Sequence, residues 1–291
     1  MKQSLTFRAS LLSGLILLVL LGVWHLATLQ APVAAAPAAA LTAEQIEYLK
    51  LQGKDPTASS VDRKAGSFPT PAQMGETVVK HLSSPFYDNG PNDKGIGLQL
   101  AYSLARVALG FGIAVLVAVP LGFVLGMSPL FYKALYPYIN VLKPISPLAW
   151  MPLALYTIKD SSVSGVFVIF ICSVWPMLIN TAFGVAGVRR DWMNVARTLE
   201  VGALRKSFQV ILPAAAPTIL TGMRISIGIA WLVIVAAEML VGGTGIGYFI
   251  WNEWNNLSLT NVIFAILMIG LIGMALDWIF GRLQHAVSYV E

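Results

Sequence analysis

A guanidinium and a carboxylate share one long apolar segment in the C-terminal third of this chain. Arg224, Gly228, Trp231, Val235 and Glu238 recur at spacings of four, three, four and three residues, which places them on one face of a helix. At 1.5 Å per residue Arg224 and Glu238 lie about 21 Å apart along the axis, so they cannot pair with each other. If the segment spans a bilayer, each of them requires a partner on another helix or a wet cavity.

Two interpretations of this face stay open. In the first, the face lines a translocation route in which Arg224 attracts an anion. In the second, Arg224 and Glu238 anchor the helix at its two membrane interfaces. Trp231, which lies between them, is either a steric gate or a packing residue.

Two more basic residues lie in apolar surroundings. Lys143 is next to Pro144 in a segment that Pro147 and Pro152 also interrupt. Broken helices at membrane depth are tolerated only where they are buried in protein or line a cavity, so Lys143 is a candidate pathway residue. Arg106 is a further candidate, with a tether near the outer side as its alternative role.

Residue groups typical of catalysis are not expected here. The three histidines, His25, His81 and His285, are scattered, and Cys172 is the single cysteine. The glycine-rich run 243–247 has a superficial likeness to a dinucleotide-binding loop, but it follows an apolar helix and not a strand. We predict a tight outer turn there, and neither a catalytic residue, a metal site nor a cofactor in this chain.

The composition predicts an integral membrane protein. Mean hydropathy is +0.73, 57% of the residues are hydrophobic and 11% are charged, whereas soluble domains carry about a quarter charged residues. The net charge of +5 does not indicate nucleic-acid binding, because the basic residues lie at the ends of apolar runs.

Six apolar segments are long enough to cross a bilayer as helices, which makes the expected fold all-α. Their approximate bounds are 11–29, 98–127, 135–157, 163–188, 214–241 and 259–280. Basic residues before the first segment and between the others place both termini in the cytoplasm. The expected organisation is an N-terminal tip and first helix (1–30), an external linker and loop (31–97) and a five-helix core (98–291).

The first segment has two interpretations, an uncleaved anchor or a signal peptide; the length of its apolar run favours the anchor. The stretch that follows it begins with an Ala/Pro-rich linker at 31–37. Residues 42–50 then predict a short helix, with Thr42 as its cap.

A mixed-charge, helix-prone segment lies between the fourth and fifth apolar segments, at 190–213. Val195, Leu199 and Leu204 offer an apolar edge there, and several charged side chains flank it. An apolar helix edge fits a groove of a partner protein, so we predict a docking segment on the cytoplasmic side. The alternative is an ordinary basic loop that only orients the chain. Pro213 is expected to open the fifth helix.

This segment resembles the EAA loop of permease subunits of type I ABC importers, which couples the permease to an ATPase subunit. The pattern Glu-Ala-Ala, three residues, Gly is represented by Asn194-Val195-Ala196, then Arg197-Thr198-Leu199, then Glu200. Glu200 replaces the glycine of the pattern, and Gly202 follows two places later. The resemblance implies that these residues contact the ATPase, together with Pro213, which closes the pattern.

The resemblance extends from about residue 68 to the C-terminus and is greatest to the nitrate/sulfonate/taurine branch, especially the cyanobacterial nitrate and bicarbonate permeases. It rests on the runs 68–71, 104–111, 120–122, 147–155, 237–239 and 242–252. It implies a type I importer permease with six spans that pairs with a second copy of itself. It also implies two cytoplasmic ATPase subunits carrying ATP and Mg, and an external solute-binding protein. The implied solute is nitrate with nitrite, and the alternatives are bicarbonate or a sulfonate such as taurine.

Two other classes of protein fit the sequence less well. A secondary transporter or channel would show inverted repeats between the halves of the chain, and none is recognisable in the sequence. It would also leave the docking segment without a role. A membrane enzyme would need a cluster of histidines or carboxylates within its spans.

Overall fold

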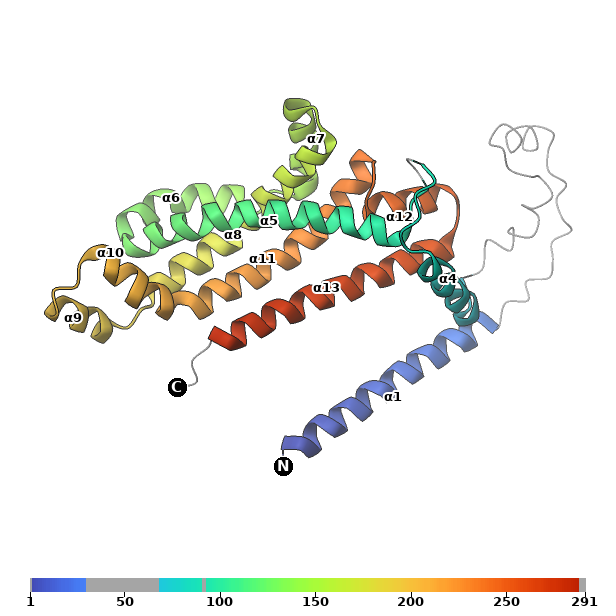
Figure 1. Cartoon of the computed structure of the whole chain (residues 1–291), viewed down its shortest axis with the longest axis horizontal. Coiled ribbons are helices and arrows are strands. Elements are labelled where there is room, and N and C mark those ends of the chain that lie inside the picture. Colours follow the sequence, from blue (N-terminus) through green and yellow to red (C-terminus); the bar gives the residue numbers. More distant parts are fainter. Residues whose placement is uncertain (1, 30–67, 91–92, 288–291) are drawn as a thin grey trace, which may run out of the picture. The chain divides into compact units, whose positions relative to one another are not determined.

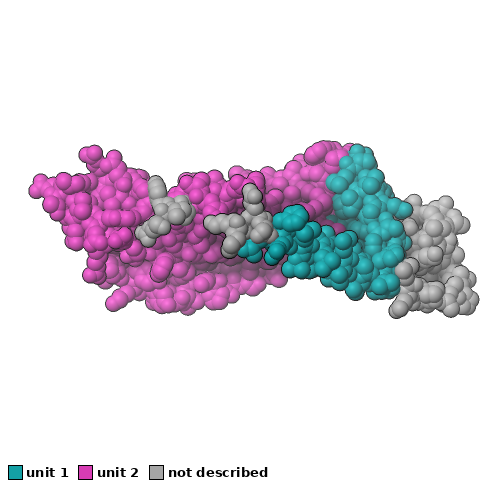
Figure 2. Space-filling view, turned by 90° about the horizontal axis from the view of Figure 1, so that it is seen from below, with its two compact units in different colours: residues 1–84, 253–264 teal, residues 85–252, 265–291 magenta. Residues whose placement is uncertain are grey.

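The computed structural model describes residues 2–29, 68–90 and 93–287 of the 291-residue chain (Figure 1). The predicted linker at 31–37 and helix at 42–50 lie outside these residues. Two compact units are distinguished in Figure 2: residues 1–84 with 253–264, and residues 85–252 with 265–291. The described residues form helices, turns and one isolated antiparallel bridge, Asp88 with Lys94, so the predicted all-α class is confirmed.

The first unit contains α1 (Lys2–Leu29) and α4 (Pro71–Ser83). Trp24 donates from its indole nitrogen to the carbonyl of Pro69 at 2.9 Å, which joins α1 to the segment before α4. Thr70 caps α4 in a complete capping box with Gln73, and Pro71 follows at the first helical turn. The sequence therefore defines the start of α4 sharply.

Three long helices form the core of the second unit: α5 (Ile96–Met127), α8 (Ser161–Ala186) and α11 (Leu212–Val241). The helix α8 packs against both α5 and α11 (Figure 1). Gly122 and Gly126 of α5 meet α8 so closely that a Cβ on either would lie 2.6–2.8 Å from α8 atoms. Their small-residue spacing therefore serves packing within the subunit.

Five helices are long and apolar enough to cross a membrane, among the residues that the structure describes. They span Phe7–Thr28, Ile96–Met127, Ser161–Ala186, Ala203–Val241 and Leu259–Val287. These five correspond to five of the six predicted segments. The largest difference is at the predicted segment 214–241, whose helix begins earlier, at Ala203.

The predicted third span is wrong as a single helix from 135 to 157. Two helices lie there, α6 (Pro129–Leu142) and α7 (Pro147–Ile158), with residues 143–146 between them. Lys143 still has helical geometry, but neither Pro144 nor Pro147 has an N–H with which to continue the helix that precedes it. Ser146 then accepts from the N–H of Leu148 and begins α7 as a new helix.

Candidate functional site

The predicted docking segment begins with α9 (Arg190–Thr198), a strongly amphipathic helix. Val195, Leu199 and Leu204 are all exposed, Leu199 at 70%, while Ala196 is buried. Thr198 donates to the carbonyl of Asn194 within the helix. Apolar side chains exposed in this way beside polar ones are typical of a contact surface for another protein.

Glu200 occupies the left-handed position of the turn that ends α9. Its φ is +49°, in the left-handed region that glycine usually occupies. The N–H of Val201 donates to the carbonyl of Ala196 and the N–H of Glu200 to that of Arg197, both at 3.0 Å. These two bonds form a Schellman motif with Glu200 at its left-handed position. The turn therefore lies where the family pattern has its glycine, and Gly202 instead precedes the next helix.

Pro213 lies in the first turn of α11, as predicted, but helical structure already precedes that turn. Helical structure runs without interruption from α10 (Ala203–Lys206) through a π-helical turn, η1 (Ser207–Ile211), into α11. In that turn the N–H of Leu212 reaches back five residues to the carbonyl of Ser207. A proline inside an α-helix leaves one carbonyl without its donor and clashes with it, and the wider π-turn before Pro213 accommodates that defect.

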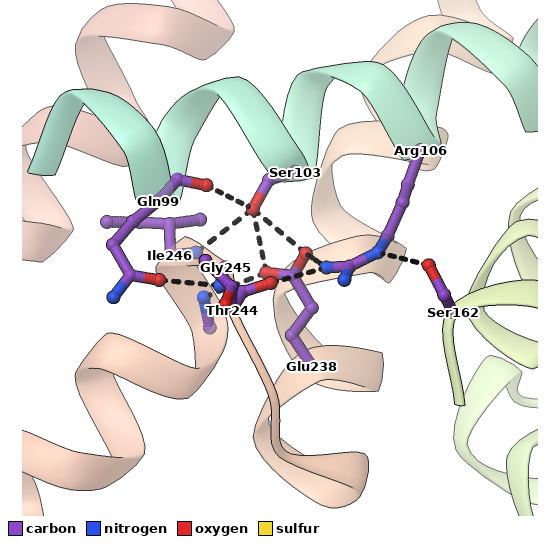
Figure 3. Close-up of polar contacts among 9 residues, drawn as sticks. Gln99, Ser103, Arg106, Ser162, Glu238, Thr244, Gly245 and Ile246 are labelled. Atoms are coloured by element: carbon purple, nitrogen blue, oxygen red, sulfur yellow. Dashed lines mark hydrogen bonds and ion pairs between the residues drawn. The ribbon is translucent and has the colours of Figure 1, made fainter. Parts of the chain in front are cut away.

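Glu238, near the C-terminal end of α11, is the centre of a buried polar cluster (Figure 3). Its side chain is 4% exposed and lies 2.7 Å from Nη1 of Arg106 on α5. The Oγ of Ser103, one turn earlier on α5, donates to the same carboxylate at 2.8 Å. The N–H of Gly247 donates to it at 3.1 Å. Several donors thus compensate one buried charge.

The glycine-rich turn between α11 and α12 (Ile246–Asn255) wraps this carboxylate. The N–H of Gly245 donates to Oε1 of Gln99 at 2.6 Å, and the N–H of Ile246 donates to Oγ of Ser103 at 2.9 Å (Figure 3). A Cβ on Gly245 would overlap the carboxylate of Glu238. Glycine is therefore required at 245 for the close approach of backbone and carboxylate.

Arg106 also joins elements other than α11. Its Nη1 donates to the carbonyl of Thr244 at 2.6 Å, and its Nε donates to Oγ of Ser162 at the start of α8 at 3.0 Å (Figure 3). One guanidinium thus connects α5, α8, α11 and the turn after α11. A small pocket lies beside it and is lined by residues of α7, α8 and α11. Of the two roles predicted for Arg106, this geometry favours the tether.

Arg224, near the middle of α11, pairs with Asp277 on α13 (Leu259–Val287). Its Nε donates to Oδ1 at 2.6 Å and its Nη2 to Oδ2 at 2.5 Å, a bidentate arrangement. Of the two alternatives predicted for Arg224 and Glu238, a partner on another helix or a wet cavity, the structure shows a partner on another helix for each. Unlike the Glu238 cluster, this pair is open: the side chains are 39% and 57% exposed.

Trp231 packs against α13. Its indole ring is buried, and Nε1 donates to the carbonyl of Ile269 at 3.0 Å. Gly273 leaves room for the ring, since a Cβ there would lie 3.4 Å from Cδ1. The packing alternative accounts for Trp231 in this conformation, and a gating role stays a prediction.

Lys143 lies at the break between α6 and α7. Its side chain is exposed, and its backbone N–H ends α6 by donating to the carbonyl of Ile139 at 2.9 Å. It is not brought next to Arg224 or Glu238 by any contact in the described part of the chain. Its pathway role stays a prediction.

The sequence analysis missed three polar residues of these sites, Gln99, Ser103 and Asp277. A signal existed for each of them. Gln99 and Ser103 are four residues apart in an apolar segment and precede Arg106, and Asp277 is an acid within the last apolar segment. Intramembrane polar residues usually meet one another, so Arg106 and Glu238 should have prompted a search for them.

The described fold is that of a multi-pass membrane protein, and comparison with known proteins gives its family. Residues 118–289 match the family described as binding-protein-dependent transport system inner membrane component. The chain belongs to this family, the permease subunits of ABC importers.

Two named relatives differ in solute. The chain is 43% identical over 228 residues to the nitrate import permease protein NrtB of Synechocystis sp., covering 78% of this chain and 83% of the relative. It is 42% identical over 208 residues to the bicarbonate transport system permease protein CmpB of the same organism, covering 71% and 74%.

Two solved structures share the fold. An inward-facing MetNI methionine ABC transporter matches with a TM-score of 0.59 at 13% identity, over 65% of this chain and 94% of that one. An amino acid ABC transporter with histidines matches with a TM-score of 0.56 at 15% identity, over 74% and 97%. At these identities the comparison establishes the fold of type I importer permeases.

Proposed function

We propose that this chain is the permease subunit of an ATP-driven importer of nitrate, with nitrite as a second solute. The carrying observation is the 43% identity over 228 residues to a protein named as a nitrate import permease. Bicarbonate is the second candidate, because the relative named for bicarbonate is 42% identical. Nitrate and bicarbonate are both planar monovalent oxyanions, so a pathway for one nearly fits the other. A sulfonate such as taurine is a more distant alternative.

The proposed assembly places two copies of this chain in a bacterial plasma membrane, with both termini in the cytoplasm. Two ATPase subunits, which carry ATP and Mg, grip the segment 190–213, and an external solute-binding protein delivers the anion. The exposed apolar edge of Val195, Leu199 and Leu204 supports the ATPase contact, because it offers a helix edge for a groove.

Coupling then follows from the continuity of one helical segment. The segment Ala203–Val241 starts beside the turn at Glu200 and runs past Arg224 to Glu238. When ATP binding draws the ATPase subunits together, a displacement of α9 and α10 is transmitted along this segment to the pathway. The π-helical turn before Pro213 is the weakest point of regular helix along it, so bending concentrates there.

The proposed anion pathway follows the open face of α11, with Arg224 as its principal cation and Lys143 as a second one. Arg224 is the better supported of the two because its guanidinium is accessible at the middle of a membrane-spanning helix. Arg224→Ala should lower anion uptake and leave binding of the ATPase subunits intact. Loss of the ATPase contact in this variant would assign Arg224 a structural role instead.

The deciding experiment measures uptake of isotopically labelled nitrate into proteoliposomes that hold this chain, its ATPase partners and its binding protein. Uptake that requires ATP and persists in excess bicarbonate is the expected result. ATP-dependent entry of bicarbonate without nitrate would retain the assembly and change the solute. Nitrate entry that proceeds without ATP would instead indicate a secondary transporter or channel.

A further inference from the structure

Two ion pairs join membrane-spanning helices in the second unit, and they differ in how completely their charges are engaged. Arg106 is 15% exposed and donates to Glu238, Thr244 and Ser162. Arg224 is 39% exposed and donates only to Asp277, in the part of the chain that the structure describes. The Arg106–Glu238 pair belongs to a buried hydrogen-bonded cluster, whereas Arg224 of the second pair has N–H groups without a hydrogen-bond partner among the described residues.

The unused donors of Arg224 lie on the edge that Nη1 and Nη2 form, because Nη2 carries a second N–H besides the one that Asp277 binds. Asp277 occupies Nε and Nη2, the edge of a guanidinium that matches a planar carboxylate in a bidentate way. Nη1 has no hydrogen-bond partner within the described ranges. Gly281 of α13 lies beside it without a side chain, and a Cβ there would already be 3.6 Å from Nη1. An anion can therefore approach Arg224 along the edge that Nη1 and Nη2 form, beside Gly281.

The exposure of the pair indicates what lies next to it. Both residues lie well inside the bounds of their helices, α11 and α13, and Asp277 is 57% exposed. Charged groups of membrane-spanning helices almost always face protein or water. Of these surroundings, a water-filled pathway fits an arginine with free donors, since such donors bind a passing anion.

We propose that Asp277 is the counter-charge that limits how tightly Arg224 holds the transported anion. This inference rests on the proposed function. A lone guanidinium in a low-dielectric pathway would bind a planar oxyanion in a bidentate way and release it slowly. Asp277 occupies one of the two bidentate edges of the guanidinium and adds a negative charge next to the other. The anion is then left with one edge of Arg224, and conduction requires such weak binding because the anion must leave as well as enter.

The test is Asp277→Asn in the proteoliposome uptake assay with labelled nitrate. Asparagine keeps the size of the side chain and removes its charge. The KM for nitrate at the permease step should fall by about tenfold or more, since a repulsive charge is lost and a donor edge is freed, and the maximal rate should fall with it. The binding protein should be kept saturated with nitrate while the concentration of the loaded binding protein is varied. Its own affinity for nitrate then does not limit uptake.

Asp160→Asn is the matched control. Asp160 caps α8 by accepting from the N–H of Val163 at 2.8 Å, and asparagine caps a helix equally well. The same chemical change should leave both KM and maximal rate unaltered there. A KM for Asp277→Asn that is unchanged or higher, in a variant that still shows ATP-dependent nitrate uptake, would overturn the proposal for Asp277.

A charge exchange separates this role from a purely structural pair and remains informative if Asp277→Asn fails to fold. The double variant Arg224→Asp with Asp277→Arg keeps the ion pair between α11 and α13. Our proposal predicts a folded protein with a KM for nitrate changed by at least about fivefold, because the free guanidinium edge moves to another helix. A wild-type KM in this variant would show that the pair only fastens the two helices. If wild-type protein shows no ATP-dependent nitrate uptake at all, the proposed solute fails first, and the same variants are then measured with bicarbonate.

Discussion

The carboxylate of Glu238 and the guanidinium of Arg106 meet at 2.7 Å across 132 residues of sequence, and the turn after α11 folds over their contact. Glu238 is 4% exposed, and Ser103 and Gly247 complete its hydrogen bonding. A buried carboxylate is tolerated only with such partners. The pair therefore holds α5, α11 and the start of α12 in one arrangement.

Removing both members of this pair should destabilise the protein by less than the sum of the two single losses. Arg106→Ala and Glu238→Ala each leave one buried charge without its partner, at a cost of about 3–5 kcal/mol. Thermal unfolding in detergent should give a lower midpoint for each single variant, with the double variant closer to the wild type than the sum of the two losses. Additive losses would show that Arg106 and Glu238 are not energetically coupled.

Gly245 should not tolerate a side chain. A Cβ there would overlap the Glu238 carboxylate, so Gly245→Ala should displace the turn and lower the midpoint of thermal unfolding by several degrees. Gly112→Ala on α5 is the matched control, because nothing lies within 4 Å of its Cβ position. Equal midpoints for the two variants would contradict the close approach of the turn to Glu238.

The turn after α9 should become more stable when glycine, which its backbone conformation favours, replaces Glu200. Glu200 has a φ of +49°, which costs a residue with a Cβ roughly 1 kcal/mol relative to glycine. Glu200→Gly should therefore raise the unfolding midpoint slightly. A lower midpoint would mean that the Glu200 side chain stabilises the turn by more than this backbone cost.

A bulky apolar residue at 200 tests coupling as opposed to stability. Glu200→Leu should insert into the membrane normally but separate ATP hydrolysis from nitrate uptake, because it alters the predicted contact with the ATPase. The ratio of nitrate taken up to ATP hydrolysed is the measurement. A ratio equal to that of Glu200→Gly would exclude the Glu200 side chain position from the coupling contact.

Hydropathy predicted the membrane-spanning helices well because the length and apolar character that a span requires are local properties of the sequence. It failed at the third span, where Pro144 and Pro147 interrupt the helix although the apolar run continues. The spacing of Arg224 and Glu238 sufficed to predict that each pairs elsewhere. It could not identify Arg106 and Asp277 as the partners, because those contacts join helices 132 and 53 residues apart and depend on how the helices pack.

Trp231 offers a choice between gating and packing that one pair of variants decides. Trp231→Phe keeps an aromatic ring beside Gly273 but loses the hydrogen bond from Nε1 to the carbonyl of Ile269, a loss of about 1 kcal/mol. Trp231→Ala removes the ring. If Trp231 only packs, both variants should lower the unfolding midpoint, Trp231→Ala more strongly, and nitrate entry should still require ATP. ATP-independent leakage of labelled nitrate through folded Trp231→Ala, but not through Trp231→Phe, would instead show that the ring closes the pathway.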